Sequence, residues 1–76
     1  MNQKRRREIS EVVSALRNIQ SDVESIRDDE QDCLDNMPEN LENSERYEKM
    51  EAAVDSLDDA IDSIEDAIDS LDKTCE

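Results

Sequence analysis

The sequence predicts an all-α protein, an antiparallel two-helix hairpin with coiled-coil-like heptads. The 76 residues include no Gly and one Pro, and the frequent Ala, Leu, Ile, Glu, Lys and Arg residues favour helices. Apolar residues recur at heptad spacing in two long segments, whereas strands would require alternation. A short segment around the Pro separates them. We therefore expect one helical-hairpin domain over residues 1–76.

The first apolar segment predicts a helix over about residues 4–34. When the heptad is labelled a to g with Ile9 at a, apolar residues fill positions a and d, and Glu30 is the one exception. We expect these side chains to face the second helix. They are Ile9, Leu16 and Val23 at a, and Val12, Ile19, Ile26 and Cys33 at d.

The segment DNMPENLENS predicts a break in the helical structure, with a loop over 35–43. Pro38 cannot continue the first helix, because it lacks an amide hydrogen and clashes with the preceding turn. Ser44 is the expected N-cap of a second helix. A connection this short makes the two helices antiparallel neighbours.

The second helix is predicted over about residues 44–74, and every a and d position of its heptads is apolar. It contains AVDSLDDAIDSIEDAIDSLDK, which is one heptad pattern repeated three times. Its a and d positions predict the stripe that faces the first helix. They hold Tyr47, Val54, Ile61, Ile68 and Cys75 at a, and Met50, Leu57, Ile64 and Leu71 at d.

Alanines at position g predict that two hairpins dimerise into a four-helix bundle. Ala53, Ala60 and Ala67 occupy g in the second helix, and Ala15 occupies g in the first. They widen the apolar stripe and allow close approach of another helix, which suits a bundle more than a two-stranded coil. In the alternative, the chain is a monomer and Ala merely favours helix formation.

The outer face of the second helix carries an acidic stripe of eight carboxylates at positions b, e and f. They span about 25 Å at 1.5 Å per residue, or roughly one charge every 3 Å, compared with about 3.4 Å between phosphates in one DNA strand. This similarity suggests that the helix imitates a nucleic-acid backbone, although a charged face can also serve only solvation. The acidic stripe consists of Asp55, Asp58, Asp59, Asp62, Glu65, Asp66, Asp69 and Asp72.

The near-absence of bases in this stripe favours a binding role. Carboxylates four residues apart destabilise a helix by about 0.2–0.5 kcal/mol per pair, and Lys73 is the one base among positions b, e and f of the three repeats. The net charge is −14, and residues 8–76 hold five bases and 23 acids. Such a surface repels nucleic acid and anionic lipid and attracts basic protein surfaces.

Four of the nine bases form the cluster Lys4–Arg7 near the N-terminus. This cluster could bind nucleic acid or act as a localisation signal. We favour a third interpretation, in which an antiparallel hairpin places it beside Asp69, Asp72 and Glu76 and neutralises part of their charge.

The composition argues against catalysis, so we expect no enzyme, no cofactor and no metal site. Without His there is no imidazole base, and two Cys do not form a usual zinc site. Cys33 and Cys75 occupy core heptad positions at opposite ends, which predicts buried thiols and no intrachain disulfide. An intermolecular disulfide remains open.

The segment most informative about localisation is the N-terminus. MNQKRRRE leads into no apolar region typical of a secretory signal, and no apolar run is long enough to cross a membrane. We therefore expect a cytoplasmic protein that is not embedded in a membrane.

The stretch DNMPENLENSERYEKMEAAVDSLDDAIDSIEDAIDSL resembles a group of short uncharacterised acidic helical proteins of Gram-positive phages and prophages. In these proteins an N-terminal helix precedes a DNMPENL-type turn, a SERYEK start and an acidic repeat helix. The likeness covers residues 35–71 well and the first helix loosely. It implies a mobile element in a bacterial host and no particular site residues. By analogy, this setting favours an acidic inhibitor of a host restriction or CRISPR enzyme.

The sequence as a whole predicts a noncatalytic protein-binding module, a homodimer whose acidic stripe blocks a basic, nucleic-acid-binding site of a host protein. The alternative is a structural or adaptor coiled-coil protein that acts through its heptad faces. Direct nucleic-acid binding through Lys4–Arg7 is a third interpretation, which the overall charge disfavours.

Overall fold

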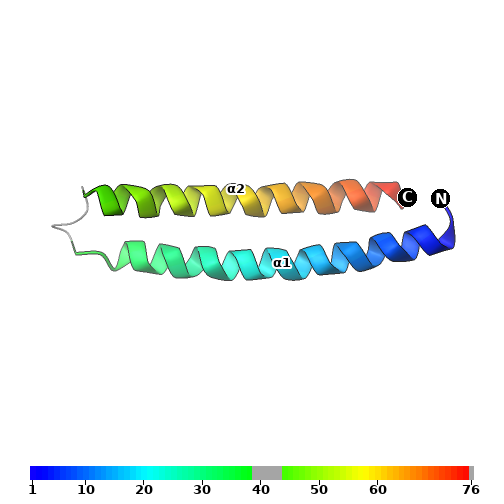
Figure 1. The fold of residues 1–76 in the computed structure, drawn as a ribbon, viewed down its shortest axis with the longest axis horizontal. Coiled ribbons are helices and arrows are strands. Elements are labelled where there is room, and N and C mark those ends of the chain that lie inside the picture. Colours follow the sequence, from blue (N-terminus) through cyan, green and yellow to red (C-terminus); the bar gives the residue numbers. More distant parts are fainter. Residues whose placement is uncertain (39–43, 76) are drawn as a thin grey trace.

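The computed structural model describes residues 1–38 and 44–75 and contains two long antiparallel helices (Figure 1). Helix α1 spans Gln3–Asp35 and helix α2 spans Glu45–Thr74. The helices pack along their lengths, and the part of the chain that is described contains no strand. The predicted all-α hairpin is confirmed. Most of the predicted loop, residues 39–43, lies outside the described residues.

Side-chain and backbone caps fix the ends of α1. The Asn2 carboxamide oxygen accepts a 2.8 Å hydrogen bond from the backbone N–H of Arg5, as at an N-cap. At the other end the Asn36 N–H donates to the Asp32 carbonyl at 3.0 Å. Pro38 follows two residues later and has no N–H with which to extend the helix.

Helix α2 begins at the predicted cap. The Ser44 hydroxyl oxygen accepts a 3.1 Å hydrogen bond from the Tyr47 N–H. Glu45 and Glu48 lie in the first turn and Lys73 lies in the last, so each charge has the sign that the helix dipole favours. Helix α2 therefore begins at Glu45, one residue after the predicted start at about residue 44.

The a and d positions of α2 face α1, as predicted. Val54 is 4% exposed and Ile68 is fully buried, whereas Leu57, Ile61 and Ile64 are half-buried. The described residues contain only two other buried side chains, Val13 and Leu34 of α1. The core is therefore a single thin line of side chains between the two helices.

The expectation that α1 packs through a and d is wrong for its d positions. Val12, Ile19 and Ile26 are 49%, 49% and 56% exposed, and Cys33 is exposed as well. Position e takes their place against α2, because Val13 and Leu34 are both 8% exposed. The a positions Ile9, Leu16 and Val23 are half-buried.

A rotation of α1 about its own axis accounts for this difference. Positions d and e flank position a on opposite sides of a helix, so turning e toward a neighbour turns d away. Besides Val13 and Leu34, position e carries Gln20 and Arg27, and both bond to α2. The rotation thus combines apolar burial at Val13 and Leu34 with polar contacts at the two e positions between them.

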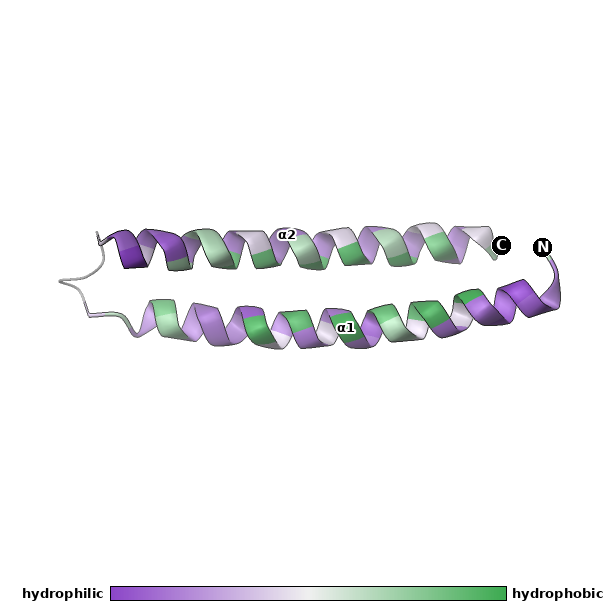
Figure 2. Cartoon of the chain, in the orientation of Figure 1, coloured by the Kyte–Doolittle hydropathy of each residue, from purple (hydrophilic) through white to green (hydrophobic). Residues whose placement is uncertain are grey.

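The hairpin is a rod of 59 × 15 × 13 Å with a radius of gyration of 17.4 Å, compared with about 11 Å for a compact chain of this length. Its accessible surface is 5707 Å², whereas a typical monomer of this mass exposes roughly 4,800 Å². Hydrophobic residues lie along both helices among hydrophilic ones (Figure 2). A two-helix rod leaves much of this apolar surface in contact with water.

Candidate protein-binding surfaces

The acidic stripe lies on α2, where seven of its eight residues are exposed and Asp58 is half-buried. A straight helix places positions b and f away from the core and position e at the border with α1. The stripe therefore has two parts. Asp55, Asp59, Asp62, Asp66 and Asp69 face outward at b and f, and Asp58, Glu65 and Asp72 lie at e along the α1 border.

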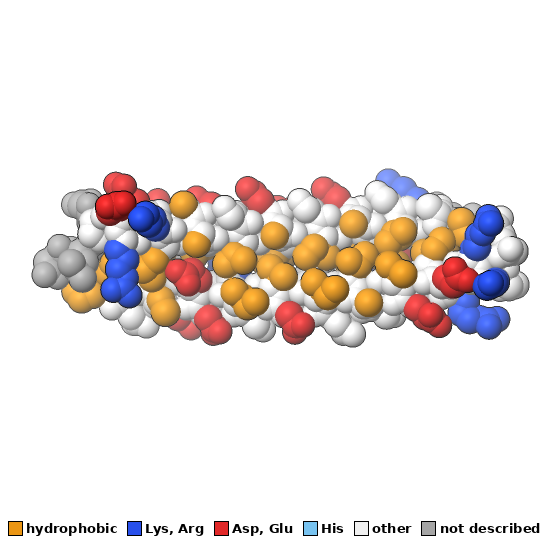
Figure 3. Space-filling model, viewed as in Figure 1, with side chains coloured by type: hydrophobic (Ala, Val, Ile, Leu, Met, Phe, Trp, Pro, Cys, Tyr) orange, Lys and Arg blue, Asp and Glu red, His pale blue; other side chains and the backbone are white. Residues whose placement is uncertain are grey.

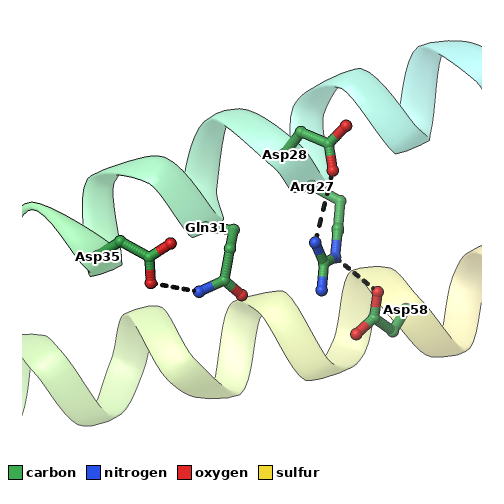
Figure 4. A network of polar contacts seen from close by, with 5 residues as sticks. All are labelled: Arg27, Asp28, Gln31, Asp35 and Asp58. Atoms are coloured by element: carbon green, nitrogen blue, oxygen red, sulfur yellow. Dashed lines mark hydrogen bonds and ion pairs between the residues drawn. The ribbon is translucent and has the colours of Figure 1, made fainter.

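Arg27 of α1 holds the first of the border acids. Its Nε donates a 2.8 Å hydrogen bond to Oδ1 of Asp58, and its Nη1 lies 3.4 Å from Oδ1 of Asp28 (Figure 4). The hydrogen bond with Asp58 is the main cause that raises the pKa of Arg27, so this guanidinium stays charged. Arg27 is partly buried and links the loop-side half of α1 to the middle of α2.

Gln20 links the middle of α1 to the middle of α2. Its Nε2 donates to the carbonyl oxygen of Ile61 at 3.3 Å and to Oε2 of Glu65 at 2.9 Å. Gln20 is neutral, so this contact brings no positive charge to Glu65. The hydrogen bond to the Ile61 carbonyl joins a side chain of α1 to the backbone of α2. It therefore shows which residues of the two helices lie at the same level along the rod.

The third border acid, Asp72, lies 3.7 Å from the Arg17 guanidinium, and both side chains are more than half exposed. An ion pair with this exposure contributes little to stability. Together, Arg17 and Arg27 reduce the charge of the eight acids to −6. The stripe remains strongly negative after its contacts with α1.

The five outward acids make no ion pair or hydrogen bond with another side chain within residues 1–38 and 44–75. They extend over about 21 Å of helix, or roughly one charge every 4 Å. This spacing is wider than the 3 Å obtained when all eight acids are counted, because three lie at the α1 border. The outward acids are Asp55, Asp59, Asp62, Asp66 and Asp69.

The N-terminal basic cluster does not make the contacts that we expected. Lys4 lies 4.0 Å from Glu8 of its own helix, and Asp72 pairs with Arg17 instead. Over the described residues, Arg5 and Asp69 form no ion pair. The third expected acid partner, Glu76, lies outside the described residues. Neutralisation of the α2 end by Lys4–Arg7 is therefore not observed for the described acids.

The opposite side of the hairpin is apolar. Contacts between Gln20 and Glu65 and between Arg27 and Asp58 join position e of α1 to position e of α2. Position d of α1 and position g of α2 must then share the other side. We call this the apolar side; it comprises Val12, Ile19 and Ile26 of α1 and Ala53, Ala60 and Ala67 of α2.

Figure 3 shows a band of hydrophobic side chains that runs along both helices on the face in view, with acidic residues at its edges. Heptad counting alone assigned the aliphatic d residues to the core and missed this surface. One signal in the sequence was available: α1 also carries Val13 and Leu34 at e, so its apolar stripe is wider than one neighbouring helix covers.

The thiols lie differently from the buried pair that we expected. Cys33 is exposed and Cys75 is half-buried, and neither forms a disulfide. In the described parts of the chain no group of three His, Cys, Asp or Glu side chains is arranged to hold a metal ion. Over the same residues, neither helix has an apolar stretch long enough to cross a bilayer.

The fold and these surfaces define a helical hairpin with one acidic and one apolar side. Comparisons of the chain with protein-family models, curated proteins and solved structures found no match. The acidic stripe and the apolar side are the features of this hairpin that suit it to binding.

Proposed function

We propose that this protein is a noncatalytic protein-binding module whose acidic stripe binds a basic surface on another protein. The observation that carries this proposal is the row of five outward acids on one face of α2, none of which pairs with a cation of the described chain. Carboxylates at this density attract Lys and Arg at long range and increase the association rate with a basic partner.

The more specific proposal is that the stripe occupies a DNA- or RNA-binding site of a host protein, such as a CRISPR or restriction enzyme. Sites of this kind place several Lys and Arg side chains to contact successive phosphates. A rigid helix presents its carboxylates in a fixed row and loses little conformational entropy on binding. The resemblance to phage and prophage proteins supports this use in the cytoplasm of a bacterial host.

A capture experiment with matched variants tests the acidic stripe. The immobilised protein is incubated with bacterial lysate, and the bound proteins are identified by mass spectrometry. The stripe variant replaces Asp55, Asp59, Asp62 and Asp66 with Ser. The control variant replaces the exposed α1 acids Glu8, Glu11, Asp22 and Glu24 with Ser and changes the net charge by the same amount.

The proposal predicts a nucleic-acid-binding partner that the stripe variant loses and the control variant retains. It also predicts strong weakening of the complex in high salt, because screening reduces the attraction between the charged surfaces. Equal binding by the wild type and the stripe variant would show that the stripe is only a solvated face.

A structural or adaptor role is the second candidate, and the exposed aliphatic residues of the apolar side favour it. A surface of this kind is typical of helices that pack against further helices. In that case the captured partner would depend on Val12, Ile19 and Ile26, and high salt would leave the complex intact.

We also propose that the chain forms a homodimer with four helices. The thin core, with four buried side chains among the described residues, supports this, because a single core of that size gives a small domain little stability. Sedimentation equilibrium tests it: a dimer has twice the 8.8 kDa mass of one chain. A mass of one chain at every concentration would disprove the dimer and leave the acidic-stripe proposal standing.

A further inference from the structure

The apolar side has the features of a self-complementary interface. We propose that a second copy of this chain covers it, related to the first by a two-fold axis that passes near Ile19 and Ala60. In this arrangement α1 packs antiparallel to α1 of the second copy and α2 packs antiparallel to α2, so that the two loops lie at opposite ends. The inference rests on the proposed homodimer and specifies its surface, its axis and its helix order.

The chain exposes about as much surface beyond that of a typical monomer as a standard interface covers. The surface of 5707 Å² is roughly 900 Å² larger than a typical monomer of this mass exposes. A standard protein–protein interface covers about 800 Å² on each partner. Val12, Ile19 and Ile26 are each about half exposed, at intervals of seven residues. Their burial is the main apolar gain available on this side.

The two rows of the apolar side are each symmetric about their middle residue. Val12 and Ile26 lie seven residues either side of Ile19, and Ala53 and Ala67 lie seven either side of Ala60. An antiparallel partner helix pairs such a row with itself, so the same patch serves both copies, as in an isologous interface.

One two-fold axis can serve both rows, because their centres lie at similar heights along the rod. Gln20, next to Ile19, donates to the backbone carbonyl of Ile61, next to Ala60. Neighbouring residues differ by only 1.5 Å along a helix, so the two centres lie within roughly one turn of each other. The rotation that superposes the aliphatic row on itself therefore superposes the alanine row as well.

Charge favours this helix order over the one in which both loops lie at the same end. About an axis at Ile19, Arg5 lies over the turn of the second copy that carries Asp29 and Asp32, both exposed. With both loops at one end, α1 would lie over α2 of the second copy. Arg5 would then lie beside the end of α2 of the second copy, where the nearest described residues on that face, Ser70 and Thr74, carry no charge. Among the residues that the structure describes, the antiparallel α1 pair gives Arg5 its acidic neighbours.

This arrangement leaves the acidic stripes free for a partner. Two border acids of each stripe, Asp58 and Glu65, contact α1 on the side of the hairpin opposite to the apolar side, and the five outward acids face away from α1. In the dimer the two stripes therefore face outward on opposite sides of the bundle. The separation also keeps most of the negative charge of each chain away from the interface, where it would oppose association.

Disulfide cross-linking tests the axis. In a background in which Cys33 and Cys75 are replaced with Ser, the variant Ile19→Cys places identical thiols face to face across the axis. Oxidation should convert most of this variant to a covalent dimer. The matched control Ser14→Cys, exposed at position f of α1, should remain a single chain under the same conditions.

A mixed experiment covers the case in which Ile19→Cys weakens the dimer. Val12→Cys and Ile26→Cys, made separately, should cross-link to each other when mixed and poorly to themselves. If neither experiment gives the cross-link while sedimentation shows a dimer, the axis and helix order are wrong and the homodimer stands. If sedimentation shows one chain only, both the arrangement and the homodimer are wrong. Neither result bears on partner capture by the acidic stripe.

Discussion

Arg27 of α1 and Asp58 of α2 are joined by a 2.8 Å hydrogen bond between Nε and Oδ1, the shortest ion pair between the two helices. Both residues lie at heptad position e. Their contact, together with that of Gln20 and Glu65, places polar position e of both helices on one side of the hairpin. As a consequence the aliphatic d positions of α1 lie on the other side, in water.

The pair between Arg27 and Asp58 should couple the helices energetically. Arg27→Gln and Asp58→Asn should each lower the unfolding midpoint in urea, and the double variant should lower it by less than the sum. A double-mutant cycle followed by circular dichroism measures this coupling. The cycle for Lys49 and Glu45, an exposed pair within α2, is the control and should show weaker coupling. If the effects of the two substitutions on the unfolding free energy simply add, Arg27 and Asp58 do not help to orient the helices.

Ile68 should be the residue of α2 most sensitive to truncation, because it is the one fully buried side chain among the described residues. Ile68→Ala removes three buried carbons and should cost about 2–5 kcal/mol of unfolding free energy. The exposed Ser70→Ala in the same turn should change it by less than about 0.5 kcal/mol. Urea denaturation gives both values, and a similar cost at the two positions would contradict the packing described for α2.

Ser44 should stabilise α2 through its hydroxyl cap on the Tyr47 N–H. Ser44→Ala should therefore lower the unfolding free energy by about 1 kcal/mol. Ser14→Ala, at an exposed position inside α1, should instead stabilise by a few tenths, roughly 0.5 kcal/mol at most, because Ala is the better helix former. Thermal unfolding of the two variants should thus shift in opposite directions.

Salt should stabilise this hairpin. The acidic stripe contains four pairs of carboxylates four residues apart, which together cost about 1–2 kcal/mol at low ionic strength. Screening reduces this repulsion, so the melting temperature should rise between 10 mM and 1 M NaCl, where the Debye length falls from about 30 Å to 3 Å. The stripe variant with four Ser residues should show a smaller rise. A melting temperature that falls with salt would mean that the attractive pairs dominate.

Heptad counting predicted the two helices, the Ser44 cap and the a and d contacts of α2, because each depends on residues close in the sequence. It could not predict the rotation of α1. Apolar residues at a, d and e allow two rotations of that helix, and contacts of Gln20 and Arg27 with residues 31 or more positions away select between them. The heptad pattern of one helix carries no information about such partners.

The same rotation changes the candidate site. All eight stripe acids were predicted to face outward, yet Asp58, Glu65 and Asp72 lie against Arg27, Gln20 and Arg17. Periodicity assigns a side chain to a face of its helix, and the neighbouring helix then decides whether that face is covered. For this reason the outward acids and the exposed aliphatic residues emerged only from the packed hairpin.

Competition with nucleic acid is the most direct test of the proposed function. The partner captured through the acidic stripe is purified with its labelled DNA or RNA bound, and this protein is titrated in while fluorescence anisotropy follows the label. We expect the wild type to displace the nucleic acid, whereas the variant with Asp55, Asp59, Asp62 and Asp66 replaced by Ser should not. A stable ternary complex of partner, nucleic acid and this protein would contradict this expectation.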